Sequence, residues 1–195
     1  MQIGVDSFGA VISDPTTGLT VSALQRMDNP LDEIILAEQV GLDVFGIGEH
    51  HRSEFVDSAP VVILAAAATR TKNILLTSAV TVLSAADPVR IFQELATLDL
   101  ISHGRTEIVV GRGSSIETFP LFGFDLEDYD SLFSEKLNLL LKIRENTHVH
   151  GLVSTVLLSQ DRRSIPVHSR IRCPFGLASA ALPNHSFVPA RSDFR

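Results

Sequence analysis

The stretch Val44–Arg52, VFGIGEHHR, decides the fold, because an apolar run stops abruptly at one carboxylate and two imidazoles. Such a run predicts a buried strand. The end of a buried strand delivers titratable groups to the edge of a sheet, and in α/β proteins ligands bind at that edge. The stretch therefore predicts both a class of fold and the place of a site.

Strand and helix signals alternate four times along the first 145 residues. Apolar and β-branched runs predict four strands, at 3–8, 42–48, 73–83 and 106–110. Periodic apolar residues and capping signals predict four helices, at 30–40, 58–70, 88–102 and 126–144. Asn29-Pro30 predicts the N-cap and first position of the first helix, after a polar loop over 14–29, and Asp87-Pro88 predicts the same for the third helix.

This alternation predicts an α/β fold with a parallel sheet covered by helices, because the strands are apolar throughout rather than alternating. Two architectures fit right-handed crossovers: an open doubly wound sheet and part of a (β/α)₈ TIM barrel. A whole barrel needs ~250 residues. About four βα units end near residue 145, so residues 1–149 are predicted to be the N-terminal half of such a barrel.

Length and composition predict an ordinary globular protein of one domain or slightly more, with 195 residues and net charge −7. The acidic balance argues against binding to nucleic acid, which usually needs a basic stripe. No window reads as a signal peptide or a membrane span, so a cytoplasmic location and no membrane partner are expected. Cys173 is the single cysteine, which excludes a disulfide framework or a thiolate zinc site.

Residues 150–195 do not continue this pattern and are predicted to be an irregular tail. Residues 151–195 hold six arginines, no lysine and two aspartates, in contrast to the acidic part before them. Shifting the reading by one base allows residues 174–190 to read P-V-W-L-G-V-G-G and then a helical segment. Two interpretations stay open: the tail is a frameshift product, or it is a disordered basic tail.

Two strand ends carry the candidate chemistry. His50 and His51 follow one strand, and consecutive strand residues point to opposite faces, so we do not expect them to share a metal. A neutral histidine at a cavity mouth suits proton transfer near neutral pH, although a hydrogen-bonded strand cap is the structural alternative. Gly111–Ser114, GRGS, follows another strand; its glycines let backbone amides approach an anion, and Arg112 can grip a phosphate. A plain surface loop is the alternative there.

Taken together, the motifs resemble the bacterial luciferase-like family of flavin-dependent monooxygenases over residues 1–145. The match includes GLDVFGIGEHH, LLTSAVTVLS, ADPVRIFQELATLDLISHGR and IVVGRGSSIETFPLFGFD. The order of ADPVR, then D-x-x-S-x-G-R, then the G-R-G strand end is highly specific. The resemblance implies a barrel that binds reduced FMN, or in some branches the deazaflavin F420, at the mouth formed by the carboxyl ends of the strands.

The resemblance also implies roles for single residues. His50 matches the family's catalytic histidine, which assists proton movement, and Arg112 with Gly113 matches the strand end near the flavin phosphate. Ser78 and Ala79 match the pair that forms a non-proline cis peptide beneath the flavin ring in many members. Glu117 lies in a loop that helps to shape the flavin pocket, and the family's remaining phosphate contacts come from later strands.

Three functions remain open at this stage. The first is an oxygenase that uses reduced flavin, supplied by a separate flavin reductase, and O₂ to oxygenate a small organic substrate, with the chemistry carried by the cofactor. The second is a truncated, non-catalytic remnant that binds flavin or associates with another chain. The third is an F420-dependent reductase. A half barrel leaves its first and fourth strands as open edges, so a homo-oligomer is expected.

Overall fold

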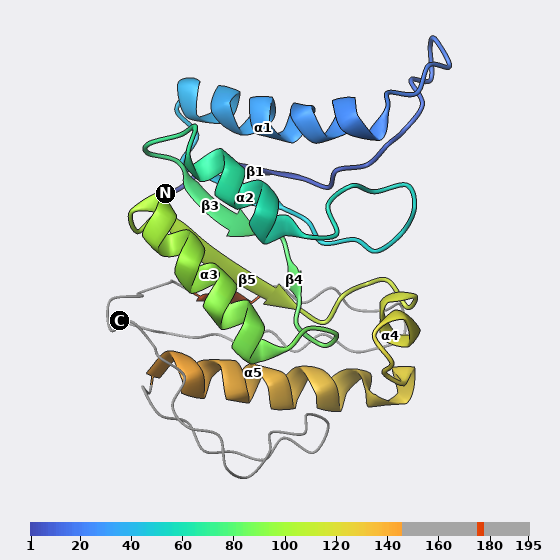
Figure 1. Ribbon diagram of the computed structural model, residues 1–195, viewed down its shortest axis with the longest axis vertical. Coiled ribbons are helices and arrows are strands. Elements are labelled where there is room, and N and C mark those ends of the chain that lie inside the picture. Colours follow the sequence, from blue (N-terminus) through green and yellow to red (C-terminus); the bar gives the residue numbers. More distant parts are fainter. Residues whose placement is uncertain (146–174, 178–195) are drawn as a thin grey trace.

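The computed structural model describes residues 1–145 and the strand 175–177, and its parallel strands form one sheet (Figure 1). The strands lie in the order β1, β2, β3, β5, with β4 and β6 also paired to β5. Both β3 and β4 pair with successive parts of β5, so they form one interrupted barrel strand. The strand bounds are β1 Gly4–Ser7, β2 Val44–Ile47, β3 Leu75–Ser78, β4 Thr81–Val82, β5 Thr106–Gly111 and β6 Phe175–Leu177.

Four long helices lie side by side against the sheet, each packed on the next along the chain (Figure 1). Their apolar residues and those of the strands form one continuous core. This arrangement confirms a partial (β/α)₈ barrel. The helical bounds are α1 Ala23–Gln39, α2 Pro60–Ala68, α3 Pro88–Ser102, α4 Thr118–Leu121, the 3₁₀ turn η1 Leu126–Asp128 and α5 Tyr129–Glu145.

Helix α1 begins seven residues before its predicted start, so the loop predicted over 14–29 is too long. Its N-cap is Ser22, whose hydroxyl accepts a hydrogen bond from the Gln25 amide at 3.2 Å. Pro30 therefore lies inside the helix and is buried there. Asn29-Pro30 imitates a helix start, but Ser22 makes the N-cap hydrogen bond and marks the true start.

The described part of the tail, residues 175–177, is a strand, where the sequence indicated an irregular segment. Phe175–Leu177 forms β6 and pairs in parallel with Ile108–Val110 of β5. The fourth predicted strand is therefore not an open edge, and that expectation is wrong; within the described residues β1 pairs only with β2. The two interpretations of the tail, frameshift product or disordered segment, fall on residues 146–174 and 178–195, which lie outside the described residues.

The D-x-x-S-x-G-R motif of residues 99–105 forms a structural joint at the amino-terminal edge of the sheet. Asp99 caps the start of β5 by accepting from the Thr106 amide at 3.2 Å, and Gly104 has a φ of 87°, which favours glycine. The Arg105 guanidinium donates to the carbonyls of Ala68, Thr71, Ile74 and Ser102 and to the Thr71 hydroxyl. The motif thus joins α2, α3 and β5.

Candidate functional site

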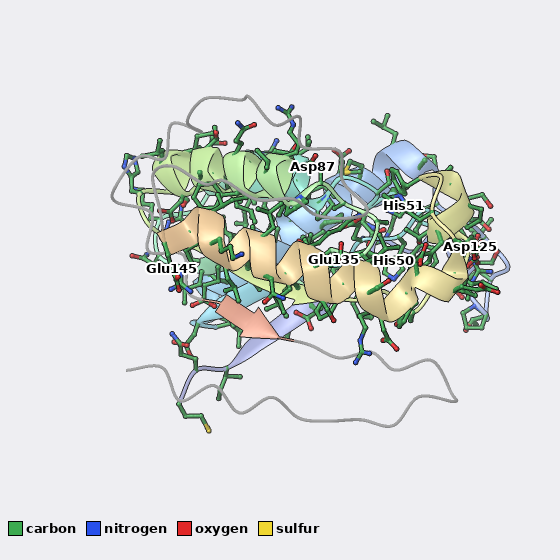
Figure 2. All side chains as sticks on the ribbon, turned by 90° about the horizontal axis from the view of Figure 1, so that it is seen from below. His50, His51, Asp87, Asp125, Glu135 and Glu145 are labelled. Carbon is green, nitrogen blue, oxygen red and sulfur yellow. The ribbon has the colours of Figure 1, made fainter. Side chains whose placement is uncertain are left out.

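The carboxyl ends of the parallel strands meet at one edge of the sheet. His50 and His51 follow β2 there, and Arg112 and Gly113 follow β5. Figure 2 shows both histidines toward the same end of the molecule as Asp125, whereas Glu145, at the end of α5, lies at the opposite end. The structure therefore brings the imidazole and the guanidinium predicted from sequence to a common edge.

His50 is held by a carboxylate and two aromatic rings. Its Nδ1 lies 2.9 Å from Oδ2 of Asp57, a side chain that is 1% exposed. Its ring stacks on Phe55 with 4.2 Å between centroids and meets the edge of Phe8 at 5.4 Å. With 21% of its side chain exposed, the imidazole is fixed in orientation and still reachable from solvent.

His51 belongs to a separate pair. Its Nε2 lies 3.0 Å from Oε1 of Glu49, and the other oxygen of Glu49 accepts a hydrogen bond from the Val82 amide at 3.0 Å. The His51 ring also meets the edge of Phe122. The two histidines therefore engage different carboxylates. Within residues 1–145 and 175–177, no group of three or more His, Cys, Asp or Glu side chains is placed to hold a metal ion.

The non-proline cis peptide lies between Ala79 and Val80, so the predicted pair, Ser78 and Ala79, is wrong by one residue. Ser78 is fully buried in β3, where its hydroxyl donates to the Val109 carbonyl at 2.9 Å and accepts from the Val109 amide at 3.3 Å. Ser78 thus bonds β3 to β5. The cis bond interrupts the barrel strand between β3 and β4, at the carboxyl edge.

Arg112 and Gly113 directly follow β5, and Arg112 contacts helix α5. Arg112 Nη1 lies 2.7 Å from Oδ1 of Asp130, and its guanidinium lies 5.8 Å from the ring centroids of Tyr129 and Phe133. Gly113 has a φ of 82°, and a Cβ there would lie 2.7 Å from a methyl group of Val82, so glycine is required. The guanidinium is 22% exposed and can meet an anion.

Tyr129 fixes this strand end from α5. Its hydroxyl donates to the Gly113 carbonyl at 2.7 Å, and burial raises the pKa of the Tyr129 phenol. The proton therefore stays on the phenol, which remains a donor at neutral pH. Sequence reasoning placed Tyr129 only on the packed face of a helix, because the spacing between residues 113 and 129 carries no sign of a hydrogen bond.

Glu117 lies on the outer rim, one residue before α4. Its carboxylate lies 3.2 Å from Nε of Arg52, which also pairs with Glu54 at 2.9 Å. About half of each side chain in the Arg52–Glu117 pair is exposed, so the pair holds two rim loops together only weakly.

The sequence analysis did not identify Asp57, the partner of His50, as a site residue, because Asp57 lies in an irregular loop with no periodic signal.

A cavity of about 670 Å³ lies between α2 and α3. Glu49 and Thr81 reach it from the sheet, and a second cavity of about 450 Å³ lies at the amino-terminal edge beside Glu38. In the described part of the chain, neither cavity includes His50 or Arg112. The same part contains no helix long and apolar enough to cross a membrane.

With this geometry in place, comparison with known proteins assigns the family. Residues 1–182 match the model of the luciferase-like monooxygenases. The chain therefore belongs to the luciferase-like monooxygenase family, and the match extends beyond the 145 residues whose motifs indicated it.

Three relatives illustrate the likeness in sequence. Protein y4vJ of Sinorhizobium fredii, whose name gives no function, is 32% identical over 146 residues, 74% of this chain and 42% of that protein. The alkanal monooxygenase alpha chain of Photorhabdus luminescens is 34% identical over 50% of this chain and 27% of its own length. The oxygenase component of a flavin-dependent trigonelline monooxygenase of Acinetobacter baylyi is 31% identical over 48% and 28%. The chain thus spans less than half the length of these relatives.

Two solved structures illustrate the likeness in fold. The oxygenating constituent of 3,6-diketocamphane monooxygenase of Pseudomonas putida, in complex with FMN, has a TM-score of 0.65 at 24% identity, over 78% of this chain and 42% of that one. An F420-dependent secondary alcohol dehydrogenase has a TM-score of 0.66 at 18% identity, over 91% and 52%. At these identities the likeness shows the fold alone.

Proposed function

We propose that the chain is the flavin-binding half of an oxygenase component, which binds reduced FMN and, with O₂, oxygenates a small organic substrate. The observation that carries this proposal is the placement of His50 and Arg112 on one carboxyl edge of a luciferase-like barrel. Relatives named as oxygenase components support a separate flavin reductase as the partner that supplies reduced FMN.

The residues at the end of β5 fit the phosphate end of FMN. Gly113 brings the backbone to a place where a side chain would collide with Val82, and the Arg112 guanidinium beside it offers bidentate donors. The Arg112–Asp130 pair is partly exposed, with Asp130 58% exposed, so a phosphate can compete for the guanidinium. Arg112, Gly113 and Glu117 are therefore the proposed FMN-binding residues of this half.

Reduced FMN supplies the electrons that activate O₂, and the protein supplies binding, orientation and proton transfer. We assign proton transfer to His50, since its imidazole is fixed by Asp57 and two rings yet partly exposed. Ser78, and Ala79, the first residue of the cis peptide, are assigned to the segment beside the flavin.

Comparing FMN with riboflavin tests the phosphate site. The two flavins differ only in the phosphate, so we expect the full chain to bind FMN more tightly, with the difference read from quenching of flavin fluorescence. Arg112→Met should weaken FMN binding by roughly tenfold or more, because it removes a charge-assisted hydrogen bond, and should leave riboflavin binding unchanged. Arg144→Met, an exposed arginine at the far end of α5, is the matched control.

An equal loss of affinity for FMN and riboflavin in Arg112→Met would refute the assignment of Arg112 to the phosphate. Binding of coenzyme F420 in preference to FMN would overturn the choice of cofactor, and binding of neither would support the non-catalytic remnant. With a reductase, O₂ and a complete barrel, His50→Ala should lower turnover by ~10²–10⁴. An unchanged rate would remove His50 from the chemistry.

A further inference from the structure

We propose that Asp57 is the positioning residue of His50: its buried carboxylate holds the imidazole proton on Nδ1 and leaves Nε2 as the nitrogen that exchanges protons. The inference rests on the proposed role of His50 and extends it to a second residue. Its direct support is the 2.9 Å distance between His50 Nδ1 and Asp57 Oδ2.

The burial of Asp57 fixes the direction of this hydrogen bond. The carboxylate is 1% exposed, and its other oxygen, Oδ1, has no hydrogen-bond partner among the described residues. A buried carboxylate without donors is costly, whereas an N–H pointed at it offsets much of that cost. His50 Nδ1 is the donor that the structure places within reach, so the proton belongs on Nδ1 rather than on Nε2.

Two aromatic rings prevent the imidazole from turning away from Asp57. Phe55 stacks on it at 15° between planes, and Phe8 meets it edge-on. Phe8 follows β1 and Phe55 lies in the loop after β2, so the imidazole sits between two segments of chain. A ring held on its faces and at one nitrogen has a single orientation, which is what proton transfer at the other nitrogen requires.

The loop that carries Asp57 is anchored to the end of β1. The Val56 amide donates to the Gly9 carbonyl at 3.1 Å, and the Val11 amide donates to the Glu54 carbonyl at 2.7 Å. Gly9 has a φ of 58°, and a Cβ on it would lie 3.0 Å from Cβ of Asp57. A side chain at position 9 would therefore be strained and would crowd Asp57, so glycine suits this position.

A second glycine makes room for the pair itself. A Cβ on Gly48 would lie 2.9 Å from Cε1 of His50 and 3.0 Å from Oδ2 of Asp57. The neighbouring histidine has a different environment. His51 contacts the Glu49 carboxylate through Nε2, and that carboxylate also accepts a hydrogen bond from the Val82 amide. Glu49 thus bridges His51 to the chain after the cis bond, whereas Asp57 is directed to His50 alone among the described residues.

Nitrogen-15 NMR of the imidazoles in the full chain tests this assignment without any flavin. Protonated and bare ring nitrogens give well-separated shifts, and neutral histidine in water favours the proton on Nε2. We expect His50 of the unmodified chain to carry it on Nδ1. Asp57→Leu keeps a side chain of similar size and removes the acceptor, so it should move the His50 proton to Nε2. Asp57→Asn keeps one acceptor oxygen, so its His50 shifts should lie between those of the unmodified chain and of Asp57→Leu. If the chain forms a large oligomer, magic-angle-spinning solid-state NMR measures the same nitrogen shifts.

Glu49→Gln is the matched control, because it alters the carboxylate of His51 and should leave the His50 shifts in place. An unchanged His50 tautomer in a folded Asp57→Leu variant would overturn the proposal, and amide spectra report folding. In the complete, active protein, Asp57→Leu should lower kcat by at least about tenfold and leave FMN binding unchanged. This loss is part of the ~10²–10⁴-fold rate enhancement that a positioned acid–base group contributes. If His50→Ala leaves turnover unchanged while the tautomer shift occurs, the proposed catalytic role of His50 fails and the positioning contact stands.

Discussion

Lys136 shows how a single side chain can be charged and buried in this fold. It lies on α5 with 1% of its surface exposed, and its ammonium donates to the Ser84 carbonyl at 2.6 Å. The same ammonium lies 3.9 Å from the centre of the Phe124 ring. Burial lowers the pKa of Lys136 to about 8, although nearby Asp87 acts in the opposite direction.

This shift predicts a pH dependence of stability that belongs to Lys136. Between about 8, the folded pKa, and 10.5, its ordinary value, the unfolded chain binds a proton on this side chain that the folded chain does not. Unfolding therefore takes up a proton, and stability rises with pH across that window. Relative to Lys136→Met, the unmodified chain should gain in free energy of unfolding between pH 8 and 10.5, measured by urea denaturation.

Lys142→Met, which removes a lysine from the exposed side of the same helix, controls for the loss of a positive charge. A free-energy difference between the unmodified chain and Lys136→Met that stays constant from pH 7 to 10.5 would contradict the assigned shift. The sequence did not reveal that Lys136 is buried, because lysine on a helix normally marks its solvated face. Tertiary contacts with the Ser84 carbonyl and the Phe124 ring make its burial tolerable.

At the scale of elements, Arg105 is the residue on which the joint between α2, α3 and β5 depends. Its five donors reach four backbone carbonyls and one hydroxyl, in the planar fork geometry that lysine cannot reproduce. Arg105→Lys should therefore cost about 2–4 kcal/mol of stability, because several partly buried acceptors lose their donors. Thermal or urea unfolding measures the loss.

Arg90→Lys is the matched substitution in helix α3. Arg90 is exposed and pairs with Glu94 four residues on, a geometry worth about 0.5 kcal/mol or less. The two arginine-to-lysine changes should thus differ several-fold in cost. Similar costs for both would refute the structural role assigned to the motif.

The accuracy of the sequence-based prediction also differs from element to element. The bounds of α3 agree with the prediction, because Asp87, Pro88 and Gly104 each act locally at its ends. The predicted start of α1 was wrong, since Asn29-Pro30 resembles a helix start and the N-cap at Ser22 was not recognised. At the site, the positions of His50 and Arg112 followed from strand ends, whereas the partners that orient them, Asp57 and Tyr129, depend on tertiary contacts that no spacing encodes.

At the scale of the whole molecule, strand β1 is the feature that predicts association. It pairs only with β2 in the described part of the chain, and apolar side chains along it and after it are about half exposed. An unpaired edge beside exposed apolar surface favours pairing with another chain. The exposed residues are Ile3, Val5 and Phe8.

We therefore expect the chain to sediment as an oligomer. Val5→Lys, which places a charge on the β1 edge, should shift it toward the monomer, since charged edges oppose strand pairing. Leu36→Lys changes another exposed apolar residue, on α1, and serves as the control. A monomeric unmodified chain with a cooperative melt would refute association through this edge.

The tail is tested at the level of the gene. If residues from about 150 onward are a frameshift product, a single-base insertion or deletion near codon 150 should restore a long open frame that continues the barrel. Sequencing the encoding DNA decides this, and the absence of such a change would leave the basic tail as the interpretation.

The position of the Arg105 joint has a consequence for judging distant members of the family. The D-x-x-S-x-G-R motif joins α2, α3 and β5 at the amino-terminal edge of the sheet, whereas His50 and Arg112 lie at the carboxyl edge. A copy that had lost its chemistry would still need that joint in order to fold. Under the proposed function, a survey for working enzymes should therefore weigh Asp57, His50 and Arg112 in addition to the D-x-x-S-x-G-R motif.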